Sequence, residues 1–134
     1  NAIKWAENQL GSDKYTFLCL SFVEDAYEAS NNIEIFGGST AKESADEYSL
    51  NQGDIPSGAF VFYNCYGAIN DEYKNWGHVG LHIGNNDVIH AWNIVRTDNY
   101  LDVEKLQPAP GWTSPEYIGW SPIERICKGY RKRE

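Results

Sequence analysis

The stretch HVGLHIGNNDVIHAW, residues 78–92, decides the fold class that this sequence predicts. Two runs rich in valine and isoleucine, 78–84 and 87–95, flank a polar tip at Asn85 and Asn86. β-Branched residues favour extended backbone, and asparagine tolerates the left-handed conformation that a tight turn requires. The pattern therefore predicts two antiparallel strands joined as a β-hairpin.

All three histidines of the chain lie in this hairpin, at positions 78, 82 and 90. In an antiparallel pair, opposed residues have position numbers with a constant sum, and their side chains share a face. A two-residue loop gives a sum of 171 and puts His78 and His90 on opposite faces. A bulged loop over positions 84–86 gives a sum near 170, so that His90 opposes Gly80 and the three histidines share one face. The Gly-Asn-Asn tip favours this second register.

Helical patterns precede the hairpin. Residues 2–10 carry apolar side chains at helical spacing and are followed by a glycine, and a second helix is predicted over 18–30 with Cys19 in its first turn. A Thr-x-x-Glu capping box at 40–43 predicts a third helix, which Gly53 closes.

The stretch GAFVFYNCY at 58–66 predicts another strand, and the proline- and tryptophan-rich part at 101–123 predicts a long loop and a last edge strand. Helices first and strands afterwards predict an α+β fold, with the N-terminal helices packed on an antiparallel β-sheet. The length fits one domain over residues 1–134.

Charge and composition exclude several classes of protein. The formal net charge is −8 and the isoelectric point is near 4.8, so a nucleic-acid backbone would be repelled. No apolar run is long enough to span a membrane, and no secretory leader opens the chain. The start at Asn1, without methionine, indicates a processed protein or a domain of a longer one.

Cys19 and the histidines fit a nucleophile with its base. A helix start and a neighbouring imidazolium each favour a thiolate, so the pKa of the Cys19 thiol is expected below its ordinary value. His78 is then the candidate base, and His90 is placed to fix its tautomer. Backbone amides at the helix start would stabilise an oxyanion, so the predicted chemistry is acyl transfer through a thioester.

Packing in the core is the competing interpretation of Cys19, because free cysteine is often buried. The histidine hairpin outweighs that interpretation here. For Cys65 and Cys127 the structural interpretation is preferred, because neither lies at a predicted helix start beside a base.

A cysteine that opens a helix, followed by HVGLHIGNNDVIHAW, resembles the NlpC-type family of papain-like cell-wall cysteine peptidases. IPSGAFVFYN and YIGW are similar to further segments of that family. The resemblance implies a papain-like fold in which Cys19 is the nucleophile, His78 the general base and acid, and His90 the orienting residue. It also implies that Tyr15 assists the oxyanion site. His82 and Trp92 are further candidates to line the site, although packing in the core is the preferred interpretation of each residue taken singly.

The same resemblance implies cleavage of peptide bonds in peptidoglycan stem peptides, next to D-γ-glutamyl, without a metal or organic cofactor. An N-acetylmuramoyl-L-alanine amidase of the same fold is an alternative. The family's Asp-Cys-Ser-Gly is LCLS here, so Leu18 stands where many members have an aspartate that recognises a free amino terminus. This departure concerns the substrate more than the reaction.

Two further alternatives belong to other classes. His78, His82 and His90 on one face are the ligands that a three-histidine zinc site would need. A non-catalytic wall-binding module is the other, because LCLS departs from the family pattern.

The expected setting is extracellular or at the cell wall, for a protein that is secreted or delivered by a phage or mobile element, as an endolysin is. An acidic domain gains little from charge steering toward an anionic wall, so a separate wall-binding or second catalytic module is expected in a longer chain.

Overall fold

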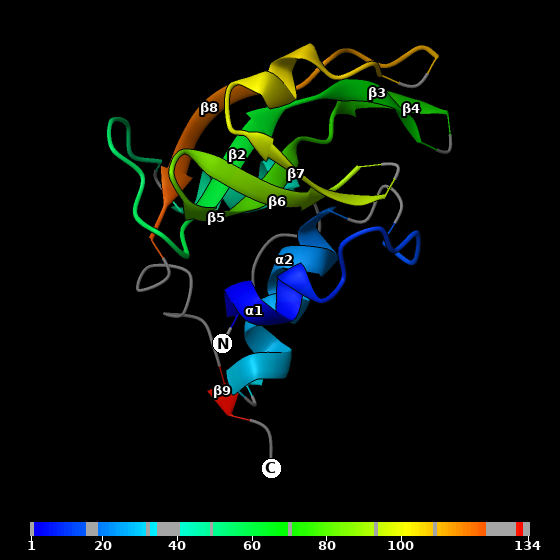
Figure 1. Cartoon of the computed structure of the whole chain (residues 1–134). Coiled ribbons are helices and arrows are strands. Elements are labelled where there is room, and N and C mark those ends of the chain that lie inside the picture. The colour runs from blue at the N-terminus through cyan, green and yellow to red at the C-terminus, as the bar shows by residue number, and fades with distance from the viewer. Residues whose placement is uncertain are drawn as a thin grey trace.

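The computed structural model describes residues 2–15, 19–31, 33–34, 41–48, 50–69, 71–92, 94–108, 110–122 and 131–132. Its centre is a five-stranded antiparallel sheet with the order β7-β6-β5-β2-β8. Two helices, α1 and α2, lie on one side of this sheet (Figure 1). The predicted α+β class, with N-terminal helices on an antiparallel sheet, is confirmed.

The helices begin close to the predicted positions, but the first ends three residues before position 10 and the third ends at Tyr48, five residues before the predicted stop at Gly53. They are α1 (Ala2–Glu7), α2 (Cys19–Asn31) and α3 (Ala41–Tyr48). Gly11 follows α1 with a φ of +83°, the left-handed conformation that glycine adopts at little cost. The predicted capping threonine at position 40 lies outside the described residues.

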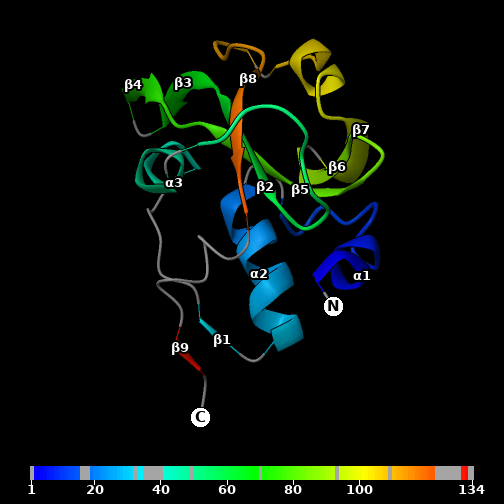
Figure 2. The same ribbon diagram turned by 90° about the vertical axis from the view of Figure 1, so that its left-hand side faces the viewer.

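The strands of the main sheet are β2 (Phe60–Asn64), β5 (His78–Gly84), β6 (Asp87–Ala91), β7 (Val95–Asn99) and β8 (Glu116–Ser121). A short 3-10 helix, η1 (Asp102–Lys105), follows β7. β3 (Tyr66–Ile69) and β4 (Glu72–Asn75) form a separate hairpin, and β1 (Ile33–Glu34) pairs with β9 (Arg131–Lys132). Figure 2 shows that this last pair lies away from the main sheet.

The sheet buries both faces. One face packs on α1 and α2, because alternate strand residues and one stripe of each helix are apolar. The other face carries Val61, Tyr63 and Val88 together with Tyr117 and Trp120 of β8, and it is covered by Val103 of η1 and by Tyr100. The core members of the helix-facing layer are Ala2, Ala6, Phe22, Val23, Ala26, Phe60, Phe62, Val79, Leu81, Ile89, Ala91 and Val95.

The hairpin between β5 and β6 has the predicted register. Leu81 pairs with Ile89 and His82 with Val88, and both pairs of position numbers sum to 170. The predicted three-residue loop is wrong in detail: Gly84 pairs with Asp87, so the turn itself is Asn85 and Asn86, and the bulge lies in β5 where the register shifts between His82 and Gly84. Asn85 and Asn86 have φ values of +54° and +62°, the left-handed conformation expected there.

Several elements were not predicted from the sequence, among them the short strands β1 and β9. The run 87–95 was expected to be one strand, but β6 ends at Ala91 and β7 begins at Val95. The β3–β4 hairpin and η1 were also missed. The last edge strand is confirmed as β8, which borders β2. Within the described residues, no helix has the length and apolar character needed to cross a membrane.

Candidate active site

Cys19 is the first residue of α2, and its thiol lies against the sheet. The backbone amides of Cys19 itself, Leu20 and Val79 are placed to hydrogen-bond the sulfur. Val79 directly follows His78 in β5, so the Cys19 sulfur lies beside the backbone of the residue next to His78. The structure thus brings the start of α2 to the start of β5.

The thiol does not rest as a thiolate at neutral pH. The residue as a whole is half-buried, but burial of the thiol raises the pKa of Cys19 to about 11. The three backbone amides act in the opposite direction and do not compensate. The expected lowering of this pKa is therefore wrong, because loss of water around the sulfur outweighs the helix start.

His78 and His90 form a direct pair. Nε2 of His78 lies 2.8 Å from Nδ1 of His90, and both residues are buried. The register explains the contact: a side chain at Gly80 would meet the Cβ atom of His90 at 3.2 Å, so His90 lies across from Gly80, with His78 two residues along the same face. The two residues twelve positions apart meet as the sequence predicted.

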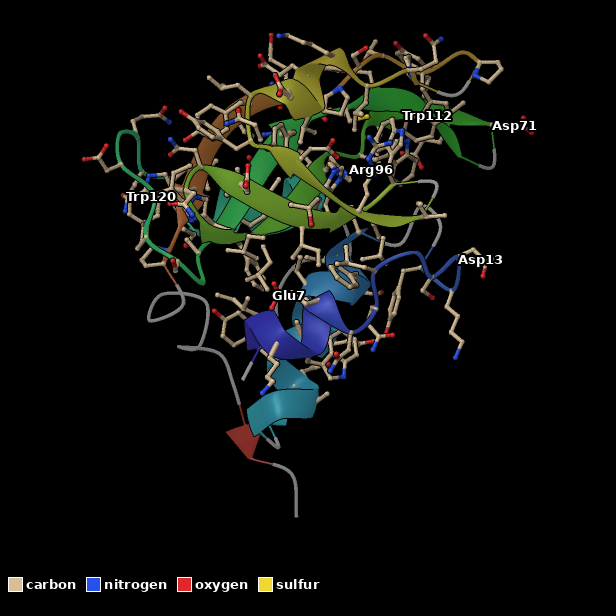
Figure 3. The ribbon with its side chains drawn as sticks, in the orientation of Figure 1. Glu7, Asp13, Asp71, Arg96, Trp112 and Trp120 are labelled. Atoms are coloured by element: carbon tan, nitrogen blue, oxygen red, sulfur yellow. The ribbon has the colours of Figure 1, made fainter. Side chains whose placement is uncertain are left out.

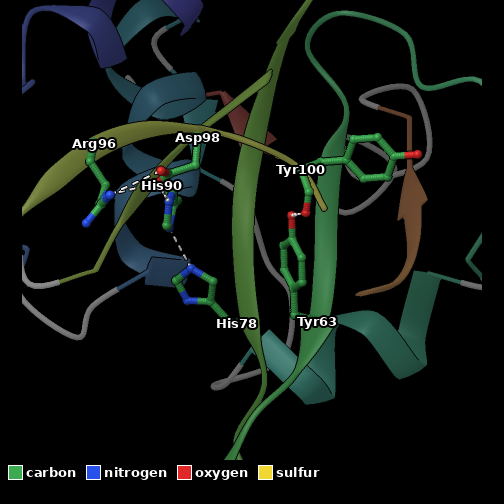
Figure 4. A network of polar contacts seen from close by, with 6 residues as sticks. All are labelled: Tyr63, His78, His90, Arg96, Asp98 and Tyr100. Carbon is green, nitrogen blue, oxygen red and sulfur yellow. Dashed lines mark hydrogen bonds and ion pairs between the residues drawn. The ribbon is translucent and has the colours of Figure 1, made fainter. Parts of the chain in front are cut away.

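The pair continues to a carboxylate that the sequence analysis missed. Nε2 of His90 lies 2.8 Å from Oδ2 of Asp98, and Arg96 donates from Nε to the same oxygen at 2.8 Å. A second Arg96 nitrogen donates to Oδ1 at 3.1 Å. Figure 4 shows the row from His78 through His90 and Asp98 to Arg96.

Strand pairing places the last two members of this row. His90 pairs with Arg96 and Val88 pairs with Asp98 across β6 and β7, so the four side chains share one face. Arg96, labelled in Figure 3, belongs to β7, which is an edge strand of the sheet. The alternation in VRTDN, residues 95–99, could have indicated this face only if β7 had been recognised as a separate strand.

Burial keeps both imidazoles neutral. Burial lowers the pKa of His78 well below its ordinary value, and the neighbouring His90 lowers it further. Burial also lowers the pKa of His90, although the hydrogen bond and charge of Asp98 oppose this effect. At Asp98 burial raises the pKa, but the hydrogen bonds from His90 and Arg96 outweigh it, so the net shift is downward.

Aromatic rings surround His78. The ring of Trp92 meets it edge-on with centroids 5.2 Å apart, and the ring of Tyr63 lies 5.8 Å away. The hydroxyl of Tyr63 donates to the carbonyl of Tyr100 at 2.7 Å, which fixes its orientation. The structure therefore places the ring of Trp92 against His78.

Tyr15 is directed elsewhere. Its hydroxyl donates to Oδ2 of Asp25 at 2.6 Å, and its ring packs edge-on against Trp5 and Phe22. Asp25 lies about 9 Å along α2 from Cys19 at the usual helical rise. These contacts give no support to the expected role of Tyr15 at an oxyanion site.

His82 is also not brought to the pair. It lies four residues from His78 along β5, a separation of about 13 Å in extended backbone. Its side chain is buried, and neither ring nitrogen has a hydrogen-bond partner of full geometry among the described residues. Burial lowers the pKa of His82, although the backbone of Pro56 and the charge of Asp87 oppose the shift.

The described residues contain no group of three histidine, cysteine or acidic side chains arranged to hold a metal ion. The alternative of a three-histidine zinc site has no support in this arrangement. Cys65 is buried and its sulfur lies 3.4 Å from the carbonyl of Thr113, as expected for a structural cysteine. Cys127 lies outside the described residues.

Comparison with known proteins agrees with this geometry. The peptidoglycan DL-endopeptidase CwlO of Bacillus licheniformis is 34% identical over 85 residues, which are 61% of this chain and 17% of that protein. The structure of NlpC1 from Trichomonas vaginalis matches with a TM-score of 0.56 and 22% identity, over 90% of this chain and 43% of that one. The chain therefore spans less than half the length of each of these two proteins.

The model of the NlpC/P60 family matches residues 6–108. This match contains Cys19, His78 and His90, and it extends through β7 to the residues around Asp98. The papain-like α+β fold of the structural relative agrees with it. Because the match covers most of the chain, this protein belongs to the NlpC/P60 family.

Proposed function

We propose that this chain is a cysteine peptidase that cleaves peptide bonds in the stem peptides of peptidoglycan. The observation that carries the proposal is the buried His78–His90 pair at 2.8 Å, at the start of the strand whose Val79 amide faces the Cys19 sulfur. Membership of the NlpC/P60 family and the similarity to a peptidoglycan DL-endopeptidase support this substrate class.

The proposed reaction starts from a neutral thiol and a neutral imidazole. Since burial raises the pKa of Cys19 to about 11 and lowers that of His78, an ion pair is not the resting state. His78 instead accepts the thiol proton as the sulfur attacks the substrate carbonyl carbon. The amides of Cys19 and Leu20, at the start of α2, are proposed to stabilise the oxyanion that forms.

His78 then donates the same proton to the departing amine, which leaves a thioester on Cys19. Water attacks this thioester with His78 as the base, and the carboxylic acid is released with the thiol restored. Trp92, whose ring lies edge-on to His78, is proposed to line the substrate side of the site. The bond next to D-γ-glutamyl is the proposed point of cleavage.

We assign Tyr15 to holding the helix rather than to catalysis, because its hydroxyl is bonded to Asp25. The domain over residues 1–134 is proposed to act at the cell wall or outside the cell, as a secreted or phage-delivered enzyme. Because its net charge is −8, wall binding is proposed to come from another module. Strong, saturable binding of this domain alone to purified wall would contradict that last point.

The test is digestion of purified peptidoglycan and of synthetic stem peptides, with products identified by mass spectrometry. A peptidase cuts within the stem peptide and releases a shorter peptide with a new internal amino terminus, whereas an N-acetylmuramoyl-L-alanine amidase frees the whole stem peptide, which then begins at L-alanine. Cys19→Ala should abolish product formation, and Cys65→Ser is the matched control for loss of a thiol, because Cys65 is buried and its sulfur lies against the carbonyl of Thr113. A Cys19→Ala protein as active as wild type would overturn the proposal. A wild type that binds wall but yields no product would indicate a non-catalytic module.

A further inference from the structure

We propose that Asp98 is a positioning residue that sets the tautomers of both His78 and His90, so that Nδ1 of His78 is the nitrogen that accepts the Cys19 proton. The tautomer assignment stands on the distances within the row and on the charge states of its members. Its consequence for catalysis rests on the function proposed above.

The first step is the contact between Asp98 and His90. An ionised carboxylate has only acceptor atoms, and Nε2 of His90 lies 2.8 Å from Oδ2 of Asp98. Nε2 of His90 must therefore carry a hydrogen and donate it. In a neutral imidazole, the other nitrogen then has a lone pair and can only accept.

The second step passes this assignment to His78. Nδ1 of His90, now an acceptor, lies 2.8 Å from Nε2 of His78. A hydrogen bond between them forms only if Nε2 of His78 carries the hydrogen. The lone pair of neutral His78 is then on Nδ1, the nitrogen that His90 leaves free for the thiol.

The charge states of the row agree with this assignment. The pKa of Asp98 is lowered by its hydrogen bonds to His90 and Arg96, which outweigh the effect of burial. The pKa of each imidazole is lowered chiefly by burial. Asp98 is thus a carboxylate and the two rings are neutral near pH 7.

Arg96 holds the carboxylate in the required orientation. Its two donors, at 2.8 and 3.1 Å, bind both oxygens of Asp98 and leave Oδ2 facing His90. The row runs from buried to exposed, because the side chain of His90 is 0% exposed, that of Asp98 is 14% exposed and that of Arg96 is 37% exposed. The carboxylate also stabilises the imidazolium that forms when His78 takes the thiol proton.

The substitution that tests this proposal is Asp98→Asn. It keeps the shape of the side chain but replaces a carboxylate, which can only accept hydrogen bonds, with an amide, which can also donate them. The chain has only three histidines, so long-range ¹H–¹⁵N spectra of the wild type and of His82→Gln identify the tautomers of His78 and His90 directly. In the wild type both rings should carry the hydrogen on Nε2. In Asp98→Asn the Nδ1–H tautomer of His90 should appear, because an amide can donate as well as accept.

Activity on stem peptides gives the second readout. Asp98→Asn should lower kcat by about 10-fold or more and leave KM within about 2-fold, as expected for a residue that acts through the base and not on the substrate. Arg96→Gln should also lower kcat, but by a smaller factor than Asp98→Asn. Asp102→Asn is the matched control, because it is the same change at an exposed carboxylate of η1 that pairs with Lys105.

An Nδ1–H tautomer of His90 in the wild type would overturn the proposal. The proposal would also be overturned if Asp98→Asn had the same tautomer spectra and the same kcat as the wild type. The tautomer spectra need no substrate. If no stem peptide is cleaved, the proposed function fails while the Nε2–H pattern and its loss in Asp98→Asn still support the role of Asp98. If cleavage is found and the tautomers do not respond, only the role of Asp98 fails.

Discussion

The Nε2 atom of His78 lies 2.8 Å from the Nδ1 atom of His90, and both rings are buried. Such a bond fixes the ring of His78 in one orientation and makes one of its nitrogens the donor. It also gives the imidazolium of His78 a partner at the moment when it holds the thiol proton. The pair therefore supplies both orientation and charge stabilisation to the proposed base.

Replacing His90 separates these two contributions. His90→Ala should lower kcat by about 100-fold, because His78 loses its orienting partner and a cavity opens at a buried position. His90→Asn keeps a side-chain acceptor and should recover part of that loss. The measurement is kcat and KM on a stem-peptide substrate for both variants.

His82→Asn is the control for this experiment, because His82 is equally buried in the neighbouring strand but stands apart from the pair. Its kcat should stay within about 3-fold of wild type, with any effect appearing in stability. Equal losses of kcat in His82→Asn and His90→Ala would show that the two substitutions act only through folding.

Gly77, directly before His78, lets the backbone at the start of β5 pack closely against α3. It has a φ of +76°, and a Cβ atom there would lie 2.6 Å from the backbone nitrogen of Lys42 in α3. Gly77→Ala should lower the free energy of unfolding by about 2 to 3 kcal/mol, from the left-handed backbone and the clash together. It should also lower kcat, because the start of β5 must move to relieve the contact.

Gly11→Ala is the matched control for that change. Gly11 has a similar φ of +83°, but a Cβ atom there would meet nothing within 4 Å. Gly11→Ala should lower the free energy of unfolding by about 1 kcal/mol and leave kcat unchanged. Chemical denaturation of both variants gives the difference, and equal losses of stability would mean that α3 yields to the added methyl group.

Glu24 gives the stability of the fold a pH dependence. Burial in α2 and, to a smaller extent, the charges of Glu28 and Asp25 together raise the pKa of Glu24 to about 7. A group whose pKa is higher in the folded state than in the unfolded state stabilises the fold when it is protonated. This contribution is lost as the pH rises from the ordinary pKa of a glutamate through the folded-state pKa of about 7. The folded protein should therefore lose stability over that range.

Glu24→Gln should remove this loss. Compared with wild type, the variant should be more stable at pH 8 by at most about 1 kcal/mol, since the half-buried side chain is partly screened by water, and equally stable at pH 4.5. Glu7→Gln, at an exposed position of α1, provides the control for a generic change of charge. A gain that is the same at both pH values would contradict the assigned ionisation.

The sequence predicts the β5–β6 hairpin because its register depends on local features. The bulge beside Gly84 and the left-handed Asn85 and Asn86 fix which residues face each other. That register, in turn, predicts the meeting of His78 and His90. Cys19 at the start of α2 is predicted from equally local helix periodicity.

The missed parts depend on contacts between distant segments. Asp98 reaches His90 only because β7 pairs with β6, and no glycine or proline at 92–94 marks the end of β6. The role expected of Tyr15 comes from the family resemblance, which says nothing of the contact between its hydroxyl and Asp25. The thiol pKa was predicted from the helix start, whereas burial against β5 determines its direction.

The resting state of Cys19 gives the last prediction. With its pKa raised to about 11 by burial, the rate of alkylation by iodoacetamide should keep rising through pH 9 instead of levelling off near neutrality. His78→Ala should lower the rate of Cys19 alkylation at pH 7, because the variant lacks the neutral imidazole that assists removal of the thiol proton. Mass spectrometry follows Cys19 separately from Cys65, whose pKa burial also raises to about 11 and whose buried thiol should react more slowly than Cys19 in both proteins. A plateau of the Cys19 rate below pH 7 would instead show a thiolate–imidazolium pair in the resting enzyme. That result would replace the general-base step proposed here with attack by a preformed thiolate, and it would leave the His78–His90–Asp98 row with the task of stabilising a permanent cation.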